Sequence, residues 1–230
     1  MLLAIDTSTA QVGLALYDGA QVLGELAWQS RTHHTQQLAP ALAELLARVD
    51  VKMDSITVLG VALGPGSFTS LRVGLAFAKG LVLARHMPVI GIPSLDVVAA
   101  AVPLSDPSTS SGQRRKLAAV LGAGRGRLAV GWYRAGENGW QADGPVTTTT
   151  AEALAEKIRK PVIVCGELSA EDRQRLARKF KNVTLASPAQ CVRRPGILAE
   201  LAWQKWQAGK TDPAASLAPI YLHTVGGPPA

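Results

Sequence analysis

The sequence is poor in aromatic residues and in cysteine. Phenylalanine, tryptophan and tyrosine together make up 5% of the 230 residues, so leucine, valine and alanine must fill most of the core. The two cysteines, Cys165 and Cys191, are not spaced as a CxxC pair. We therefore expect neither a disulfide framework nor a zinc knuckle.

Membrane and targeting signals are also missing. No stretch reaches the about 18 apolar residues that a membrane-spanning helix needs. Residues 1–6 contain no basic segment and end in an acid, which argues against a secretory signal peptide. The absence of any address favours the cytoplasm and no membrane partner.

Positive charge is concentrated in the second half of the chain. Residues 1–110 carry 6 basic and 8 acidic side chains, whereas residues 111–230 carry 18 basic and 9 acidic ones. This asymmetry fits either a polyanion near the second half or a basic surface without a partner. No recognised nucleic-acid-binding module is present.

Hydrophobic patterning predicts an α/β fold. In the first half, periods of two or continuous apolar runs predict strands, and apolar residues at helical spacing predict helices. The expected strands are 2–5, 12–17, 21–28, 56–63 and 88–92, the first three forming a meander with a turn at Gly19. The expected helices are 34–49, 69–85 and 93–101.

A similar order of elements restarts after a small, polar segment at 105–112, which we interpret as a linker or an exposed loop. The expected strands are 117–121, 128–133, 140–146, 161–165 and 183–185, and the expected helices are 150–158, 169–180 and 195–208. The repeated order indicates two related α/β domains, 1–102 and 103–212, with the tail 213–230 packing back on the first.

Asp6 stands at the end of the first strand, in the turn IDTST at residues 5–9. An acid at that place can hold a metal-bound water or face a nucleotide phosphate. An aspartate in such a turn also hydrogen-bonds its own backbone without any ligand. Asp6 and Thr7 are therefore candidates for a nucleotide-like motif, with the structural alternative open.

The segment GPGSFTSLRVG at residues 64–74 is the most informative stretch. Gly64 and Gly66 allow the backbone to approach another group closely, and Ser67 or Thr69 can cap the helix that follows. Backbone N–H groups at such a helix start can bind an anion. The segment is neither a Walker A loop nor a nucleophile elbow, which argues against a P-loop enzyme and a serine hydrolase.

Two other tempting motifs are interpreted as structural. GAGRG at residues 122–126 follows a strand, but a dinucleotide fingerprint needs a helix next, and residues 127–133 have the pattern of a strand. The neighbouring His33 and His34 would point about 100° apart on a helix and lack the HExxH context, which favours capping or surface positions.

Four segments together resemble the TsaB family, also called YeaZ. They are IDTST, a helix of the form His34…Leu38-x-Pro40, GPGSFTSLRVG, and Pro219-Ile220-Tyr221-Leu222, and the match covers the chain in order and length. The resemblance implies two domains of the actin/sugar-kinase/Hsp70 (ribonuclease H-like) type. It also implies a non-catalytic subunit that partners TsaD, the catalytic paralogue, and TsaE, an ATPase. That complex transfers a threonylcarbamoyl group to adenosine 37 of tRNAs that read ANN codons.

The sequence departs from the family pattern at two places. Ser70 stands where the family usually has glycine, and Gly122-Ala123-Gly124 stands where a second-domain hairpin typically opens with Asp-Ala-Arg. In nucleotide-using members of the superfamily, an acid at that hairpin serves the phosphates and Mg²⁺. The resemblance therefore implies no cofactor or metal of the chain's own, with ATP and Mg²⁺ only at an interface shared within the complex.

The resemblance also points to helices of the first domain as the partner surface. Gly74 and Ala78 are four residues apart, so they share one helix face and would leave a shallow groove for a second helix. We expect TsaD to bind there, and a homodimer to use the same face when the chain is alone. The predicted partner-binding residues are His34, Leu38, Leu42, Leu45, Arg72, Gly74, Leu75 and Ala78.

Two other functions are weighed against this one. A kinase-like, ATP-using enzyme needs phosphate-binding acids in both domains, and only Asp6 is in place. A metallopeptidase of the same superfamily needs a set of metal ligands, and none has the expected spacing, such as HxxxH. A plain homodimeric interaction protein would differ from the first reading only in its partner.

Overall fold

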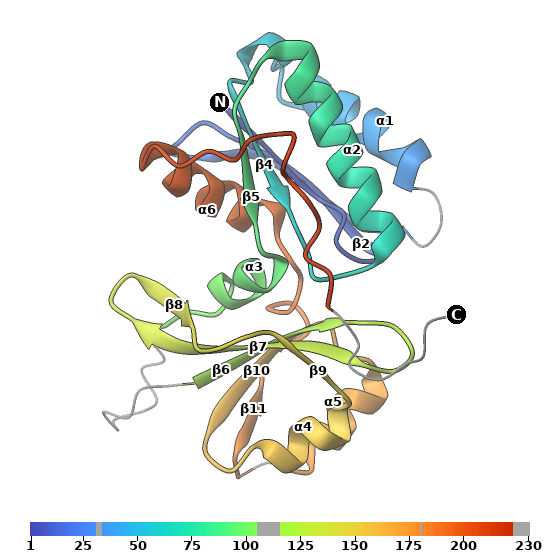
Figure 1. Cartoon of the computed structure of the whole chain (residues 1–230), viewed down its shortest axis with the longest axis vertical. Coiled ribbons are helices and arrows are strands. Elements are labelled where there is room, and N and C mark those ends of the chain that lie inside the picture. The colour runs from blue at the N-terminus through green and yellow to red at the C-terminus, as the bar shows by residue number, and fades with distance from the viewer. Residues whose placement is uncertain (31–33, 105–115, 180, 223–230) are drawn as a thin grey trace. The chain divides into compact units, whose positions relative to one another are not determined.

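The computed structural model describes residues 1–30, 34–104, 116–179 and 181–222. The chain divides into two compact units (Figure 1). Unit 1 comprises residues 1–97 and 193–220, and unit 2 comprises residues 98–192 together with Tyr221 and Leu222. Each unit contains its own sheet, which confirms the predicted α/β class.

The sheet of unit 1 has five strands in the order β3-β2-β1-β4-β5. They are β1 (Leu2–Asp6), β2 (Gln11–Tyr17), β3 (Val22–Gln29), β4 (Val58–Ala62) and β5 (Val89–Ile92). The first three form the predicted antiparallel meander, whereas β1, β4 and β5 run parallel. The central strand β1 is buried along its whole length, which explains its continuous apolar sequence.

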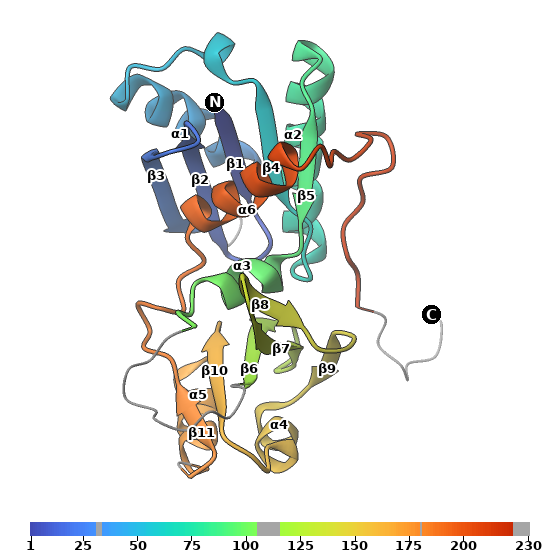
Figure 2. The same ribbon diagram turned by 90° about the vertical axis from the view of Figure 1, so that its left-hand side faces the viewer.

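Helices cover both faces of this sheet. The helices α1 (His34–Arg48) and α2 (Phe68–Arg85) lie on one face, and α6 (Pro195–Gln207) lies on the other (Figure 2). Two short helices, η1 (Met53–Ser55) and α3 (Ser94–Ala100), complete the first stretch of chain. Ser67 is the N-cap of α2, as predicted, because its side chain accepts a hydrogen bond from the backbone of Ser70.

The position of α6 differs from the sequence-based domain boundaries, which placed it in the second domain. It packs against the sheet of unit 1, where Ala199 and Ala202 join a buried cluster with Leu2 and Val58. Small side chains permit this close approach, since a Cβ on Gly60 would lie 2.7 Å from the Cβ of Ala202. A helix pattern alone does not specify which sheet will cover the helix.

The segment after α6 runs along the edge of the same sheet. The N–H of Asp212 donates to the carbonyl of Val89 (2.9 Å), and its carboxylate accepts from the N–H of Gly91 (2.7 Å). Further on, the N–H of Ile220 donates to the carbonyl of Leu63 (2.7 Å). Residues 213–220 of the predicted tail thus belong to unit 1, whereas Tyr221 and Leu222 are assigned to unit 2, and the part from 223 lies outside the described residues.

Unit 2 repeats the topology of unit 1. Its sheet has the order β11-β10-β6-β7-β8, with β9 beside β7. In both sheets the unit's first strand is central, the second and third strands follow it on one side, and two later strands lie on the other side. The elements are β6 (Lys116–Gly122), β7 (Leu128–Gly136), β8 (Gly139–Ala142), β9 (Thr147–Thr149), α4 (Ala151–Lys157), β10 (Val162–Gly166), α5 (Ala170–Ala177) and β11 (Val183–Leu185). The sequence did not predict β9, which pairs with β7.

Two predictions for this half have different outcomes. The antiparallel pairing of β6 with β7 confirms that GAGRG is a hairpin turn and not a dinucleotide loop. The predicted linker at 105–112 lies outside the described residues. In the part of the chain that is described, every helix is too short or too polar to span a bilayer.

The two glycines of α2 provide a matched test of this packing. A Cβ on Gly74 would lie 2.1 Å from Oγ1 of Thr7, a hydroxyl fixed by its hydrogen bond to the carbonyl of Ser70 (2.8 Å), whereas a Cβ on Gly80 would meet nothing within 4 Å. We expect Gly74→Ala to lower the free energy of unfolding in urea by about 1–3 kcal/mol. Gly80→Ala should raise it by up to about 1 kcal/mol. Equal effects of the two substitutions would contradict the described orientation of α2.

Candidate functional site

The two sequence motifs of unit 1 pack directly on one another. The N–H of Ser67 donates to the carbonyl of Ser8 (2.7 Å), and the Thr7 hydroxyl donates to the carbonyl of Ser70 (2.8 Å). A Cβ on Gly66 would lie only 1.9 Å from the Ser8 carbonyl oxygen, so this close approach requires glycine. The IDTST turn and the GPGSF loop therefore form one interlocked structure.

The polar groups next to this interlock bond to one another. The hydroxyls of Ser8 and Ser94 share a hydrogen bond, and both side chains are buried. The N–H of Gly64 donates to the Ser94 hydroxyl (3.0 Å), and the N–H of Ser94 donates back to the Gly64 carbonyl (2.7 Å). These contacts make the predicted loop motif a structural joint between three segments. Thr69 lies apart from the joint, exposed on α2.

Asp6 forms a buried ion pair that the sequence did not predict. Its Oδ2 accepts from Nε of Arg193 (2.8 Å), and its Oδ1 accepts from the N–H of Ser8 (2.8 Å). The side chains of Arg193 and Asp6 are 1% and 2% exposed. The hydrogen bond to Ser8 is the local backbone contact that the structural interpretation of Asp6 expected.

Further contacts hold the Arg193 side chain in this position. Its Nη2 donates to the Thr9 hydroxyl (3.0 Å) and to the Gln11 carbonyl (2.9 Å). The side-chain amide of Gln11 also bonds reciprocally to the backbone of Arg193, with both distances 3.3 Å. A basic residue before a helix ordinarily predicts an exposed side chain, and nothing local to residue 193 indicates an acid in the first strand.

This arrangement does not fit a nucleotide with Mg²⁺. Both oxygens of Asp6 are engaged within the chain, and a guanidinium stands beside the carboxylate where a cation would have to approach. The hairpin turn of unit 2 at residues 122–127 contributes Arg125 and Arg127 but no acid. Over residues 1–30, 34–104, 116–179 and 181–222, no three His, Cys, Asp or Glu side chains gather where they could hold a metal ion.

The predicted partner-binding face is mostly turned inward, so the prediction of an exposed groove there is wrong. Five of its members lie in the core of unit 1: Leu38, Leu42, Leu45, Leu75 and Ala78. Ala78 is 0% exposed, and Gly74 faces Thr7. The small residues do allow a close approach, as expected, but the neighbour is the chain's own sheet.

His34 is also buried, and its Nε2 donates to the carbonyl of Thr9 (3.3 Å). This bond ties the start of α1 to the IDTST turn, so His34 holds the fold together rather than presenting a ligand at the surface. Its neighbour His33 lies outside the described residues. Of the eight predicted partner-binding residues, Arg72 is the exposed one.

The opposite face of α2 presents apolar side chains to the outside. Phe68 is 52% exposed and Leu83 is 70% exposed. The guanidinium carbon of Arg72 lies 3.6 Å from the centroid of the Phe68 ring, a cation–π contact. Between α1 and α2 lies a hollow of about 490 Å³, which we call the α1–α2 groove. It is lined by Thr35, Leu38, Phe68, Thr69, Arg72, Val73, Ala76 and Phe77.

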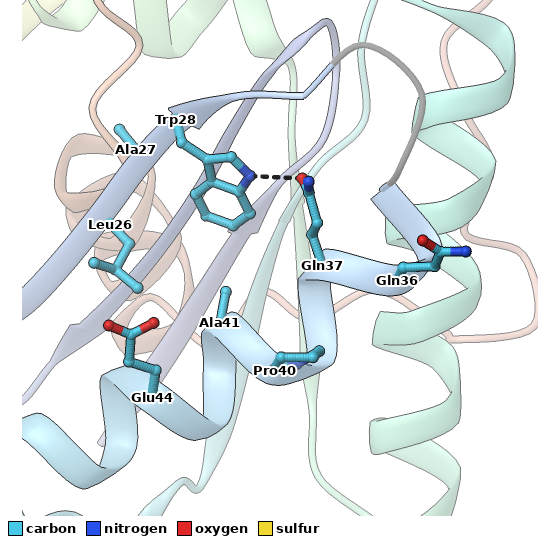
Figure 3. A pocket seen from close by; sticks show the side chains of 8 residues that line it. All are labelled: Leu26, Ala27, Trp28, Gln36, Gln37, Pro40, Ala41 and Glu44. Atoms are coloured by element: carbon cyan, nitrogen blue, oxygen red, sulfur yellow. Dashed lines mark hydrogen bonds between the residues drawn. The ribbon is translucent and has the colours of Figure 1, made fainter.

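A second hollow, of about 420 Å³, lies between α1 and the edge strand β3 (Figure 3). Nε1 of Trp28 donates to Oε1 of Gln37 (3.1 Å), whereas Gln36 points away from the indole. The remaining lining residues include Pro40 and Glu44. The hydrogen bond between Trp28 on β3 and Gln37 on α1 therefore links the helix to the edge of the sheet.

A double-mutant cycle tests the buried ion pair. Either Asp6→Asn or Arg193→Met removes one charge and leaves the other buried without its partner, which should cost about 3–5 kcal/mol of the free energy of unfolding. The double variant contains neither charge and should cost clearly less than the sum of the two single changes. Urea unfolding measures all four proteins. Single changes that each cost less than about 1 kcal/mol would mean that the pair is solvated.

Comparison with known proteins shows which family the chain resembles. Residues 26–194 match the family model described as "TsaD: tRNA N6-adenosine threonylcarbamoyltransferase". The "tRNA threonylcarbamoyladenosine biosynthesis protein TsaB" of Escherichia coli (strain K12) is 30% identical over 160 residues, covering 69% of this chain and 66% of the relative. The protein of the same name from Haemophilus influenzae is 39% identical over 102 residues, covering 44% of this chain and 42% of the relative.

A solved structure extends the comparison to the whole fold. YeaZ from Pseudomonas aeruginosa aligns with a TM-score of 0.73 at 21% sequence identity, over 96% of this chain and 99% of that one. At this level of identity the likeness carries the fold, and it confirms the predicted type of two-domain architecture. The family model over residues 26–194 and the relatives named TsaB show that the chain belongs to the TsaB (YeaZ) family.

Proposed function

We propose that the chain is a non-catalytic subunit in the synthesis of threonylcarbamoyladenosine on tRNA. In this proposal it binds and activates a TsaD-type transferase, which modifies adenosine 37 of tRNAs that read ANN codons in the cytoplasm. A TsaE-type ATPase is the third component, and tRNA is reached through the complex. The relatives are named for threonylcarbamoyladenosine biosynthesis on tRNA, which supports this pathway. The excess positive charge of residues 111–230 suits a tRNA nearby.

The ion pair between Asp6 and Arg193 is the observation that carries the non-catalytic part of this proposal. A carboxylate that serves a nucleotide has to offer an oxygen to a cation or to its water shell. Both oxygens of Asp6 already accept short hydrogen bonds inside the chain, and the neighbouring charge is positive. Asp6 is therefore already engaged within the chain, and in this proposal ATP and Mg²⁺ bind at an interface shared with the partners.

The outward face of α2 is the partner surface that we propose in place of the buried one. Phe68, Val73, Ala76 and Phe77 line the α2 side of the α1–α2 groove, where Arg72 adds one positive charge. Phe68 and Ala76 are exposed, and Val73 and Phe77 are half-buried. Exposed apolar area of this kind marks protein interfaces, and small residues such as Ala76 let a partner helix come close. We assign this surface to the TsaD-type subunit and, when the chain is alone, to a second copy of the chain.

The catalytic alternatives have less support. A kinase-like enzyme would need Asp6 free and an acid in the hairpin of unit 2, where Gly122 and Gly124 stand instead. A metallopeptidase would need a cluster of ligands, which the described residues do not bring together.

The activity of the purified chain tests its non-catalytic assignment. Without partners it should release no phosphate from ATP and Mg²⁺ above the protein-free rate. With the TsaD-type and TsaE-type proteins of the same genome it should be required for threonylcarbamoyl transfer to tRNA, measured by nucleoside mass spectrometry. ATP turnover by the chain alone that is lost in Asp6→Ala would overturn the assignment, as would full modification of tRNA in its absence.

A pair of alanine-to-arginine changes tests the partner surface. Ala76 is exposed on α2, so Ala76→Arg should fold normally but place a bulky charge in the contact and weaken pairing with the TsaD-type protein at least about tenfold. Ala20→Arg adds the same charge at the exposed turn between β2 and β3 and should pair normally. Light scattering after size exclusion measures pairing, and circular dichroism checks the fold. Normal pairing by a folded Ala76→Arg protein would refute this surface.

A further inference from the structure

The two cysteines, far apart in the sequence, lie side by side in unit 2. Cys165 is buried near the end of β10, and Cys191 is half-buried in the turn that follows β11. Their Sγ atoms are 3.8 Å apart across a sequence separation of 26 residues, and both thiols are free. The sequence spacing led us to expect no disulfide framework, because it contains no local signature of such a pair.

A cation stands beside the more accessible sulfur. Nη1 of Arg173, on α5, lies 3.8 Å from Sγ of Cys191, and Nη2 of the same guanidinium donates to the carbonyl of Ala186 (2.6 Å). The carbonyl anchors the guanidinium, so its charge is held next to Cys191. A fixed positive charge near a thiol stabilises its thiolate form, which is the nucleophile in thiol chemistry.

The two thiols differ in pKa. A hydrogen bond from the Cys165 thiol, with help from the Gly166 backbone and Arg173, lowers the pKa of Cys191 to about 6. Donation of that hydrogen bond, together with burial, raises the pKa of Cys165. The thiol nearer to the solvent, Cys191, is therefore the one whose pKa is lowered, and the buried Cys165 behind it is the one whose pKa is raised.

The surroundings allow the sulfurs to meet. Cys165 is held in β10, where it pairs with Ala119 of the neighbouring strand β6. Cys191 lies in a turn, and its own N–H donates to the carbonyl of Ser187 (3.1 Å). In the same turn, the N–H of Ser187 donates to the Gln190 side chain and the N–H of Gln190 donates to the Ser187 hydroxyl. A bond of about 2.05 Å needs an approach of less than 2 Å from the present separation. The turn, which is outside the sheet, can supply that movement.

We propose that Cys165 and Cys191 are a peroxide-sensitive dithiol that closes into an intramolecular disulfide. The Cys191 thiolate attacks one oxygen of hydrogen peroxide, the O–O bond breaks, and the products are a sulfenic acid on Cys191 and hydroxide, which takes up a proton to become water. The Cys165 sulfur then attacks the Cys191 sulfur, loses its proton, and expels hydroxide, which takes up that proton as a second water. Two thiols are oxidised and one peroxide is reduced.

Peroxide titration of the reduced full-length chain tests this proposal. One molar equivalent should remove both thiols, with an intact-mass loss of about 2 Da and a cross-linked peptide pair containing Cys165 and Cys191, and dithiothreitol should restore them. In Cys165→Ser the sulfenic acid on Cys191 should persist and be trapped by dimedone. In Cys191→Ser the buried Cys165 should resist the same dose. Circular dichroism of the reduced variants checks that each is folded.

The wild-type chain also provides a test that needs no cysteine variant. The rate of iodoacetamide alkylation at Cys191 should rise with pH around a midpoint of about 6, because thiolate is the reacting form. Among the described residues, the titratable and charged groups facing this sulfur are the Cys165 thiol from β10 and Arg173 from α5, and the Ala186 carbonyl lies 3.7 Å from it. Arg173→Gln should move the midpoint upward and slow oxidation by about threefold or more. Thiols that stay free, a disulfide between two chains, or direct oxidation of Cys191 to sulfinic acid would each overturn the proposal.

Discussion

The buried ion pair between Asp6 and Arg193 connects the first strand of unit 1 to the segment that leads into its last helix. A buried charge without a partner is strongly destabilising, so Asp6 and Arg193 have to be buried together. The folded chain therefore has to bring residue 193 back to the end of β1. That return also delivers α6 to the open face of the sheet, where it covers Leu2 and Val58. The Asp6–Arg193 pair therefore links the IDTST turn to α6, almost two hundred residues later, and α6 in turn covers the core of unit 1.

The same contact changes the chemistry that the fold can support. Acids at the ends of first strands are natural places for cations, yet here the cation is a side chain of the protein itself. The Ser8 and Ser94 hydroxyls share a hydrogen bond, the Thr7 hydroxyl donates to the Ser70 carbonyl, and Gly66 lets its loop approach the backbone of Ser8. On the outward face of α2, Phe68 and Leu83 expose apolar surface, which is the kind of surface that marks contacts between proteins.

Local patterns were sufficient to predict most strands and helices, because period and capping are properties of neighbouring residues. The helical spacing of Leu38, Leu42 and Leu45 predicted a helix at α1, and Ser67 marked the start of α2. The spacing did not show that these leucines face the core, because they were assigned to a partner surface. The same local patterns did not predict which face of α2 points toward the sheet, because the two faces of this helix are almost equally apolar. Gly74 and Gly80 look alike in the sequence, but one meets Thr7 and the other meets open space. The ion pair, the neighbouring cysteines and the location of α6 depend on partners distant in the chain.

The discontinuity of unit 1 has a consequence for synthesis on the ribosome. Strands β1 to β5 leave the ribosome first, but the helix that covers one face of their sheet is encoded after residues 98–192, which contain every helix and strand of the unit 2 sheet described above. During translation the second unit can complete its own core while the first still has an uncovered apolar face. The older half of the nascent chain is thus the last to mature, and a chain released before residue 193 lacks both α6 and the arginine that seals Asp6.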